Sequence, residues 1–109
     1  MPLQVVVKIP VYLYSYPNVD RPDNPIANMV VSKKVILPFD FIPNSLDLAH
    51  CQSGDGKFTL HLFARVKSVQ WSELTGEVTV FCEQQEWHDK SFAEAIEKMP
   101  QSGWEIKYL

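Results

Sequence analysis

Cysteine and glycine are scarce in this sequence, and each shortage excludes a class of protein. The two cysteines among 109 residues, Cys51 and Cys82, are too few for the disulfide framework of a small secreted domain, so we expect both to be free thiols in a reducing compartment. The four glycines are spaced so that neither the G-x-G-x-x-G pattern nor the P-loop pattern occurs. Nucleotide-dependent enzymes are therefore disfavoured.

Long apolar runs and an excess of positive charge are also missing. No run approaches the roughly 20 apolar residues of a membrane-spanning helix, and the first residues lack the basic region and apolar stretch of a secretory signal. We therefore expect a cytoplasmic protein without a membrane partner. The net charge of −3 arises in residues 55–109, where nine acids stand against six bases. This balance argues against nucleic acid as the main partner, because non-specific affinity for phosphates comes from Lys and Arg.

What is present is the composition of an ordinary globular domain. Hydrophobic residues make up 46% of the chain and charged residues 21%, which is unlike the signature of disorder. A chain of 109 residues is long enough to bury one core. We therefore expect a single domain over residues 1–109, without an internal repeat and without a cofactor.

The first half of the chain contains two predicted strands. β-Branched and aromatic residues without a helical period predict a strand over residues 3–14 and another over residues 29–37. Because proline cannot donate to a sheet ladder, Pro10 predicts that the first strand lies at an edge or breaks there.

Two irregular segments follow these strands. Residues 15–27 hold three prolines and are expected to form either a surface loop or an extended arm that lies across a neighbouring subunit. Residues 38–57 carry too many apolar side chains for a free loop. We expect this second segment to pack on the sheet, with one helical turn at Ser45–His50.

Residues 57–87 carry the clearest pattern, the alternation of a β-hairpin. A turn over residues 72–76, in which Gly76 supplies a positive φ, sets Val66 opposite Cys82 and Gln70 opposite Val78. In this register the odd-numbered face carries the facing pairs His61 with Trp87, Phe63 with Gln85, Arg65 with Glu83, Lys67 with Phe81, and Trp71 with Glu77.

The C-terminal segment predicts one helix and a last strand. Ser91 and Glu94 form a capping box, and apolar residues at helical spacing continue the helix over residues 91–99 until Pro100. Alternation over residues 104–109 predicts a strand. We therefore expect an α+β fold, an antiparallel and curled sheet of about five strands in the order β-β-β-β-α-β, with the helix packed on one face.

Chemical motifs are weak. Cys51 beside His50 is the nearest candidate for a nucleophile and base, but adjacent residues of an extended segment point apart. The acids Glu83, Glu86 and Asp89 with His88 resemble an ordinary charged segment before a helix start. His50, Cys51, His61, Cys82 and His88 lack the spacing of a zinc site. We therefore expect neither an enzyme nor a metal centre.

The odd-numbered face of the hairpin mixes large aromatics with charge, as interface centres do. An ordinary solvated face with cross-strand ion pairs is the simplest interpretation. The functional hypothesis is a non-enzymatic protein–protein interaction module, self-associating through this face or through the 15–27 arm. Its expected partner-binding residues are Phe63, Arg65, Lys67, Trp71, Phe81 and Trp87. The alternative is a single-stranded nucleic-acid-binding domain that stacks bases on the same aromatics and places Arg65, Lys67, Lys33 and Lys34 along the backbone.

Overall fold

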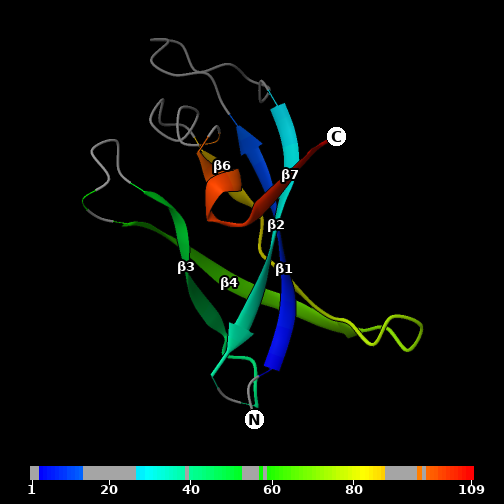
Figure 1. The fold of residues 1–109 in the computed structure, drawn as a ribbon. Coiled ribbons are helices and arrows are strands. Elements are labelled where there is room, and N and C mark those ends of the chain that lie inside the picture. Colours follow the sequence, from blue (N-terminus) through cyan, green and yellow to red (C-terminus); the bar gives the residue numbers. More distant parts are fainter. Residues whose placement is uncertain are drawn as a thin grey trace.

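A computed structural model describes residues 3–13, 27–38, 40–52, 57, 59–87, 96 and 98–109 (Figure 1). The strands are β1 (Leu3–Leu13), β2 (Ala27–Leu37), β3 (Ser45–Gln52), β4 (Thr59–Trp71), β5 (Val78–Cys82), β6 (Gln85–Trp87) and β7 (Trp104–Tyr108), with a 3-10 helix, η1 (Met99–Ser102), before β7. Strands account for 70% of the described residues and helical turns for 6%. No helix among these residues is long and apolar enough to cross a membrane.

The strands form one curled, mixed sheet with the shape of a half-barrel. Their order is β3-β4-β5-β1-β2-β7, and β6 pairs with β1 beyond the end of β5. Strand β1 lies antiparallel to β2 but parallel to both β5 and β6. The pairs β3–β4, β4–β5 and β2–β7 are antiparallel. Strand β1 therefore lies inside the sheet, with β2 and β7 on one side and β5, β4 and β3 on the other.

The predicted α+β fold, with one helix packed on an antiparallel sheet, is wrong. Among the described residues, helical conformation is limited to the 3-10 turn η1 and to Ile96, and the sheet includes the parallel pairs made by β1. Most of the predicted helix over 91–99 lies outside the described residues. After the β4–β5 hairpin the chain returns to its first strand and pairs with it in parallel. Local alternation carries no information about that return.

The helical turn predicted at Ser45–His50 is also wrong, because this segment is strand β3. Leu46 and Leu48 are buried while Asp47 and Ala49 are exposed, which is the two-residue period of a strand with one face on the core. The expectation that this segment packs apolar side chains on the rest of the sheet is confirmed, since both leucines belong to the core.

The core lies inside the curl of the sheet. Val5, Val7, Ile9 and Val11 alternate along β1 and are at most 1% exposed. Side chains from every described strand join them, and Met99 and Trp104 fill the space between β3 and β7. The alternate residues of each strand point to the convex outer face.

Pro10 lies in the interior of the sheet and β1 continues through it, so both predicted outcomes, an edge strand and a break at the proline, are wrong. It is opposite Val30 in β2. On the other side of β1, the partners of β5 end at Lys8 and those of β6 begin at Val11. The missing amide of the proline therefore coincides with the gap between β5 and β6, so the neighbouring ladder breaks there while β1 continues.

Candidate interaction surface

A β-bulge in β4 decides how the predicted interaction residues are arranged. The predicted pairing of Val66 with Cys82 is confirmed, but the register then shifts by one residue before Ser68. Lys67 is the extra residue of this bulge. Beyond it the pairs are Ser68 with Phe81, Val69 with Val80, Gln70 with Thr79, and Trp71 with Val78. The predicted pairs Gln70–Val78, Lys67–Phe81 and Trp71–Glu77 are therefore wrong.

The bulge transfers Val69 and Trp71 to the core face of the sheet. Directly opposite residues of an antiparallel pair point to the same side, so Val69 and Trp71 share a side with Val80 and Val78. Val80 is fully buried and Val78 half-buried, yet the side chains across from them remain 49% exposed at Val69 and 64% exposed at Trp71. The face that forms the core thus continues into solvent along the ribbon made by β4, β5 and their turn, which projects from the rest of the sheet (Figure 1).

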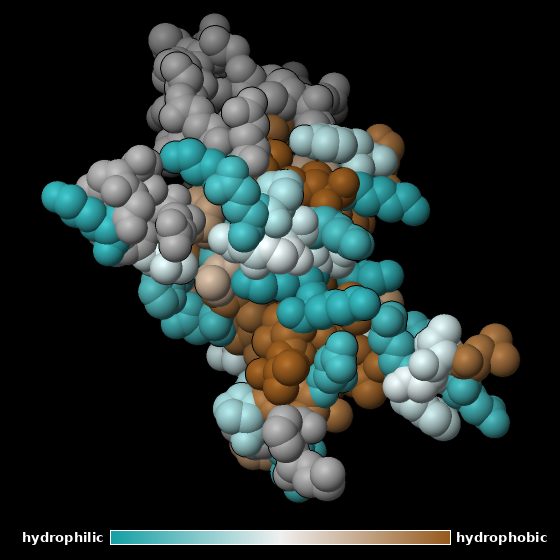
Figure 2. Space-filling model, viewed as in Figure 1, coloured by the Kyte–Doolittle hydropathy of each residue, from teal (hydrophilic) through white to brown (hydrophobic). Residues whose placement is uncertain are grey.

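Figure 2 shows hydrophobic residues at the surface in the lower half of the molecule and at the tip of this ribbon. The tip residue Leu74 is 98% exposed. The turn itself matches the prediction, because Gly76 has a φ of 70° and donates from its amide to the carbonyl of Ser72 at 2.7 Å. We name the three apolar side chains on the core face of the ribbon, Val69, Trp71 and Val78, the ribbon patch.

The outer face of β4 carries a second group of predicted residues. Phe63 is 70% exposed, and Arg65 and Lys67 are exposed as well. The His61 ring stacks on Phe63 at 6.3 Å between centroids, and its Nδ1 lies 2.8 Å from Oδ1 of Asp47. His61 lies opposite Ala49 of β3 and not opposite Trp87 as predicted.

The predicted cross-strand ion pair between Arg65 and Glu83 does not form. The two residues do meet through their backbones, since the amide of Glu83 donates to the carbonyl of Arg65 at 2.8 Å. Within the described part of the chain, however, their side chains make no ion pair within 4.0 Å. The Arg65 guanidinium therefore remains available on the outer face.

Trp87 belongs to the core, so its assignment to an exposed surface is wrong. Its side chain is 3% exposed, its indole N–H donates to Oε1 of Gln85 at 3.0 Å, and its ring meets His50 edge-on at 5.4 Å. Gln85 in turn donates to the carbonyl of Phe63 at 2.8 Å. Trp87 is buried because its strand, β6, pairs with the central strand β1 and does not extend the β4–β5 hairpin.

Phe81 takes an intermediate place. It is half-buried on the outer face, opposite Lys8 of β1 and Ser68 of β4. The six predicted residues are thus distributed over the core, the ribbon patch and the outer face. Val69 was missed, although the sequence contains a signal for it: apolar residues occupy even positions up to Val66 and odd positions from Val69, and such a change of parity indicates a bulge.

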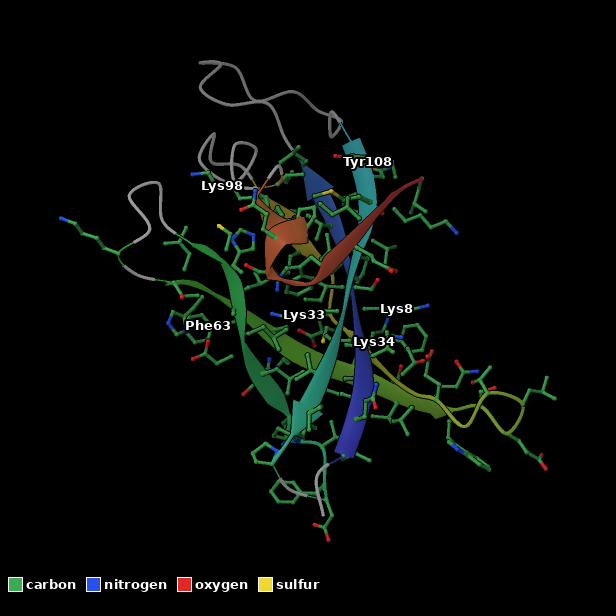
Figure 3. All side chains as sticks on the ribbon, viewed as in Figure 1. Lys8, Lys33, Lys34, Phe63, Lys98 and Tyr108 are labelled. Carbon is green, nitrogen blue, oxygen red and sulfur yellow. The ribbon has the colours of Figure 1, made fainter. Side chains whose placement is uncertain are left out.

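An open cleft of about 770 Å³ lies on the outer face of β1, β2 and β7. Lys8, Lys34 and Lys107 line it together with Glu77 and Glu105. Lys33 contributes to the lining, but its ammonium donates to the carbonyl of Ala49 at 3.1 Å and burial lowers its pKa. Figure 3 shows Lys33 pointing toward β3 and Lys8 pointing away from it.

The pair His50 and Cys51 is brought together by a second bulge, between Ala49 and Cys51. Both side chains point inward and are 1% exposed, with Sγ of Cys51 3.7 Å from Nδ1 of His50. The expectation that these neighbours point apart is therefore wrong. Burial raises the pKa of the Cys51 thiol, although the charge of Lys98 opposes this shift. A buried, protonated thiol is not an activated nucleophile.

The described residues supply no site for the other two candidate chemistries, acid–base catalysis and metal binding. Glu83 and Glu86 are exposed, while His88 and Asp89 lie outside the described residues. Over the described ranges, no group of three or more His, Cys, Asp or Glu side chains is arranged to hold a metal ion. Cys82 is buried with a pKa raised to about 11 by desolvation.

Comparisons with known proteins do not assign this chain to a family. No family model, no curated protein and no solved structure matches it. Its function is therefore inferred from the geometry and chemistry of its own residues.

Proposed function

We propose that this protein is a non-enzymatic protein-interaction module that self-associates through the ribbon patch. The observation that carries the proposal is the exposure of Trp71. Its side chain lies on the face that forms the core and is 64% exposed, opposite the half-buried Val78. Large aromatics that remain in water beside a core are what protein interfaces bury.

The energetics favour burial of this patch. Apolar surface removed from water contributes roughly 25 cal/mol per Å², and Trp71 and Val69 both have a large exposed fraction to lose. A second copy presents the same patch, so a two-fold contact between ribbons buries both sets of side chains at once. Trp is also among the residues that most often dominate interface energies.

Phe63, Arg65 and Lys67 supply a second surface on the opposite side of β4. An exposed aromatic beside a guanidinium that forms no ion pair with a described residue is a typical composition for an interface. Val69 and Trp71 of the ribbon patch belong to the same strand, β4. The predicted 15–27 arm lies outside the described residues apart from its last residue, Ala27, which begins β2.

The test is the weight-average mass of the protein by light scattering over a concentration series, with a ribbon variant, Val69→Thr with Trp71→Gln. We expect the mass of the wild type to rise with concentration and the ribbon variant to rise less. The matched control is Leu74→Ser, which removes an equally apolar residue at the ribbon tip, outside the patch. A wild type that stays monomeric, or a ribbon variant that associates as the wild type does, contradicts the proposal.

A tryptophan signal gives an independent readout. Trp87 and Trp104 are each 3% exposed, whereas Trp71 is exposed, so iodide quenching of the protein's fluorescence reports mainly on Trp71. We expect quenching to decrease as the protein concentration rises. Phe63→Ser serves as the companion variant, because it tests whether the outer face contributes to the same contact.

One observation favours the second candidate, binding of single-stranded nucleic acid. Lys8, Lys34 and Lys107 surround the cleft on the outer face, and Phe81 lies opposite Lys8 where a base could stack. Glu77 and Glu105 line the same cleft and oppose a phosphate backbone. Polarisation of labelled single-stranded RNA and DNA at low salt separates the candidates: binding that Lys34→Glu abolishes supports this function, and no signal at micromolar protein rejects it.

A further inference from the structure

Strand β7 pairs with β2 along one edge, and the hydrogen-bonding groups of its other edge can be assigned. Among the described strands it pairs only with β2. The amide of Leu109 donates to the carbonyl of Asn28 at 2.9 Å, and the backbone groups of successive residues in a strand point to opposite sides. The amides and carbonyls of Glu105 and Lys107 therefore face β2, and those of Trp104, Ile106 and Tyr108 face away from it.

The outward-facing groups are symmetric about Ile106. In an antiparallel pair of two β7 strands centred on this residue, Ile106 lies opposite the partner's Ile106, and Trp104 lies opposite the partner's Tyr108. These three residues are the ones with outward backbone groups, so each meets a partner on a hydrogen-bonded rung. No other centre within the strand brings all three outward residues into register.

The charges of β7 are complementary in the same register. Glu105 and Lys107 are exposed on the outer face of the sheet, and the arrangement places Glu105 opposite the partner's Lys107 and the reverse. Neither side chain makes an ion pair within 4.0 Å inside the described part of its own chain. Opposite charges facing each other stabilise antiparallel pairing, and like charges oppose it. A strand centred on Lys107 would instead place two lysines face to face.

We propose that a second copy of this chain pairs with β7 edge to edge, in the antiparallel register centred on Ile106. The pairing makes one continuous sheet from two protomers, a contact known from strand addition at exposed sheet edges. It also covers Tyr108, which is 59% exposed, and the half-buried Ile106 on the core side. This contact uses a different surface from the ribbon patch and goes beyond the self-association proposed there.

The edge contact is small, so its affinity is modest. Five residues of strand contribute from each copy, and interfaces below about 1,200 Å² belong mostly to weak complexes. Dimers are therefore expected to appear across a series from about 1 µM to about 1 mM protein, the range of weak dissociation constants. The experiment is carried out in the ribbon variant, Val69→Thr with Trp71→Gln, so that only the edge contact is measured.

The first substitution is Ile106→Pro. The amide it removes points away from β2, so the β2–β7 ladder keeps all its bonds and the fold is retained, which far-UV circular dichroism and the Tm verify. We expect the ribbon variant to form dimers and its Ile106→Pro derivative to remain monomeric. A ribbon variant that is monomeric throughout the series, with wild type that associates, overturns the edge contact and leaves the ribbon patch supported.

Charge reversal supplies a test that does not depend on proline. Glu105→Lys alone and Lys107→Glu alone each bring like charges together at both symmetric contacts. We expect the association constant of the dimer to fall about tenfold. The double variant Glu105→Lys with Lys107→Glu restores opposite charges and is expected to recover the wild-type constant. Failure of the double variant to recover association excludes this register. If Ile106→Pro in the otherwise wild-type chain is already monomeric, the edge contact holds and the ribbon patch proposal fails.

Discussion

The indole N–H of Trp104 donates to the carbonyl oxygen of Ala49 at 2.9 Å, and this contact joins the two edge strands of the half-barrel. The ammonium of Lys33 donates to the same oxygen at 3.1 Å and lies 5.5 Å from the centre of the Trp104 ring. Gly103, with a φ of 93°, turns the chain from η1 into β7 and so positions the indole. The curl of the sheet is thus held by side chains where no strand ladder continues from β7 to β3.

Substitution of Trp104 tests this closure. Trp104 is 3% exposed, so Trp104→Ala is expected to lower the free energy of unfolding by about 3–5 kcal/mol through loss of a buried aromatic. Trp104→Phe keeps most of the ring and loses the hydrogen bond, and is expected to cost about 1–2 kcal/mol. Urea denaturation measures both. Trp71→Phe is the control, because an exposed indole contributes little to folding of a protomer.

A loss of stability in mild acid follows from His50. Burial lowers the pKa of its imidazole from 6.5, so the unfolded chain binds the proton more tightly than the folded one. The contribution of neutral His50 to stability is complete above pH 6.5 and decreases as the pH falls below that value. We expect the urea midpoint of the wild type to fall between pH 7 and pH 5 more steeply than that of His50→Phe. Equal slopes would show that this imidazole does not govern the acid response.

The thiols provide a test of side-chain burial in β3 and β5. Cys51 is 1% exposed and Cys82 is 2% exposed, and burial raises the pKa of Cys82 to about 11. Thiolate is the reactive form, so we expect neither thiol of the folded protein to react with a disulfide reagent at pH 8, and both to react in urea. Mass spectrometry of the modified protein identifies the site. Rapid modification of Cys51 in the folded protein would contradict its packing beside His50.

The strands could be predicted from the sequence where one face is apolar. Composition located β1 and β2, and alternation located β4, β5 and β7, within a few residues. The hairpin pattern also identified the turn at Gly76 and the pair Val66–Cys82. The same rule extended to residues 45–52 would have found β3, since Leu46 and Leu48 alternate with Asp47 and Ala49. The prolines and glycines around that segment led to its interpretation as an irregular one.

The relations between distant segments could not be predicted in this way. Parallel pairing of β1 with β5 and β6 depends on the path of the chain after the hairpin, and a two-residue period does not encode a partner. This is why Trp87 was assigned to the surface although it lies in the core. Its strand, β6, pairs with β1 and not with β4. Trp71 was predicted on the outer face of the hairpin, but it lies on the core face. The extra residue at Lys67 reverses the side of the sheet for every residue of β4 that follows it.

Deletion of Lys67 tests that account of the ribbon. The bulge leaves this residue outside the ladder, so its removal allows Val66–Cys82 and Ser68–Phe81 to follow one another as regular pairs. Val69 and Trp71 then keep their partners and their side of the sheet. We expect the Tm to change by only a few degrees and iodide quenching of Trp71 to remain as in the wild type. Deletion of Val69 is the contrast: it moves Trp71 one position along the ladder, to the outer face, and is expected to weaken association through the ribbon patch. If the Lys67 deletion unfolds the protein, or if it protects Trp71 from iodide, Lys67 is not an extra residue outside the ladder. The side of the sheet on which Trp71 lies is then not set by this bulge.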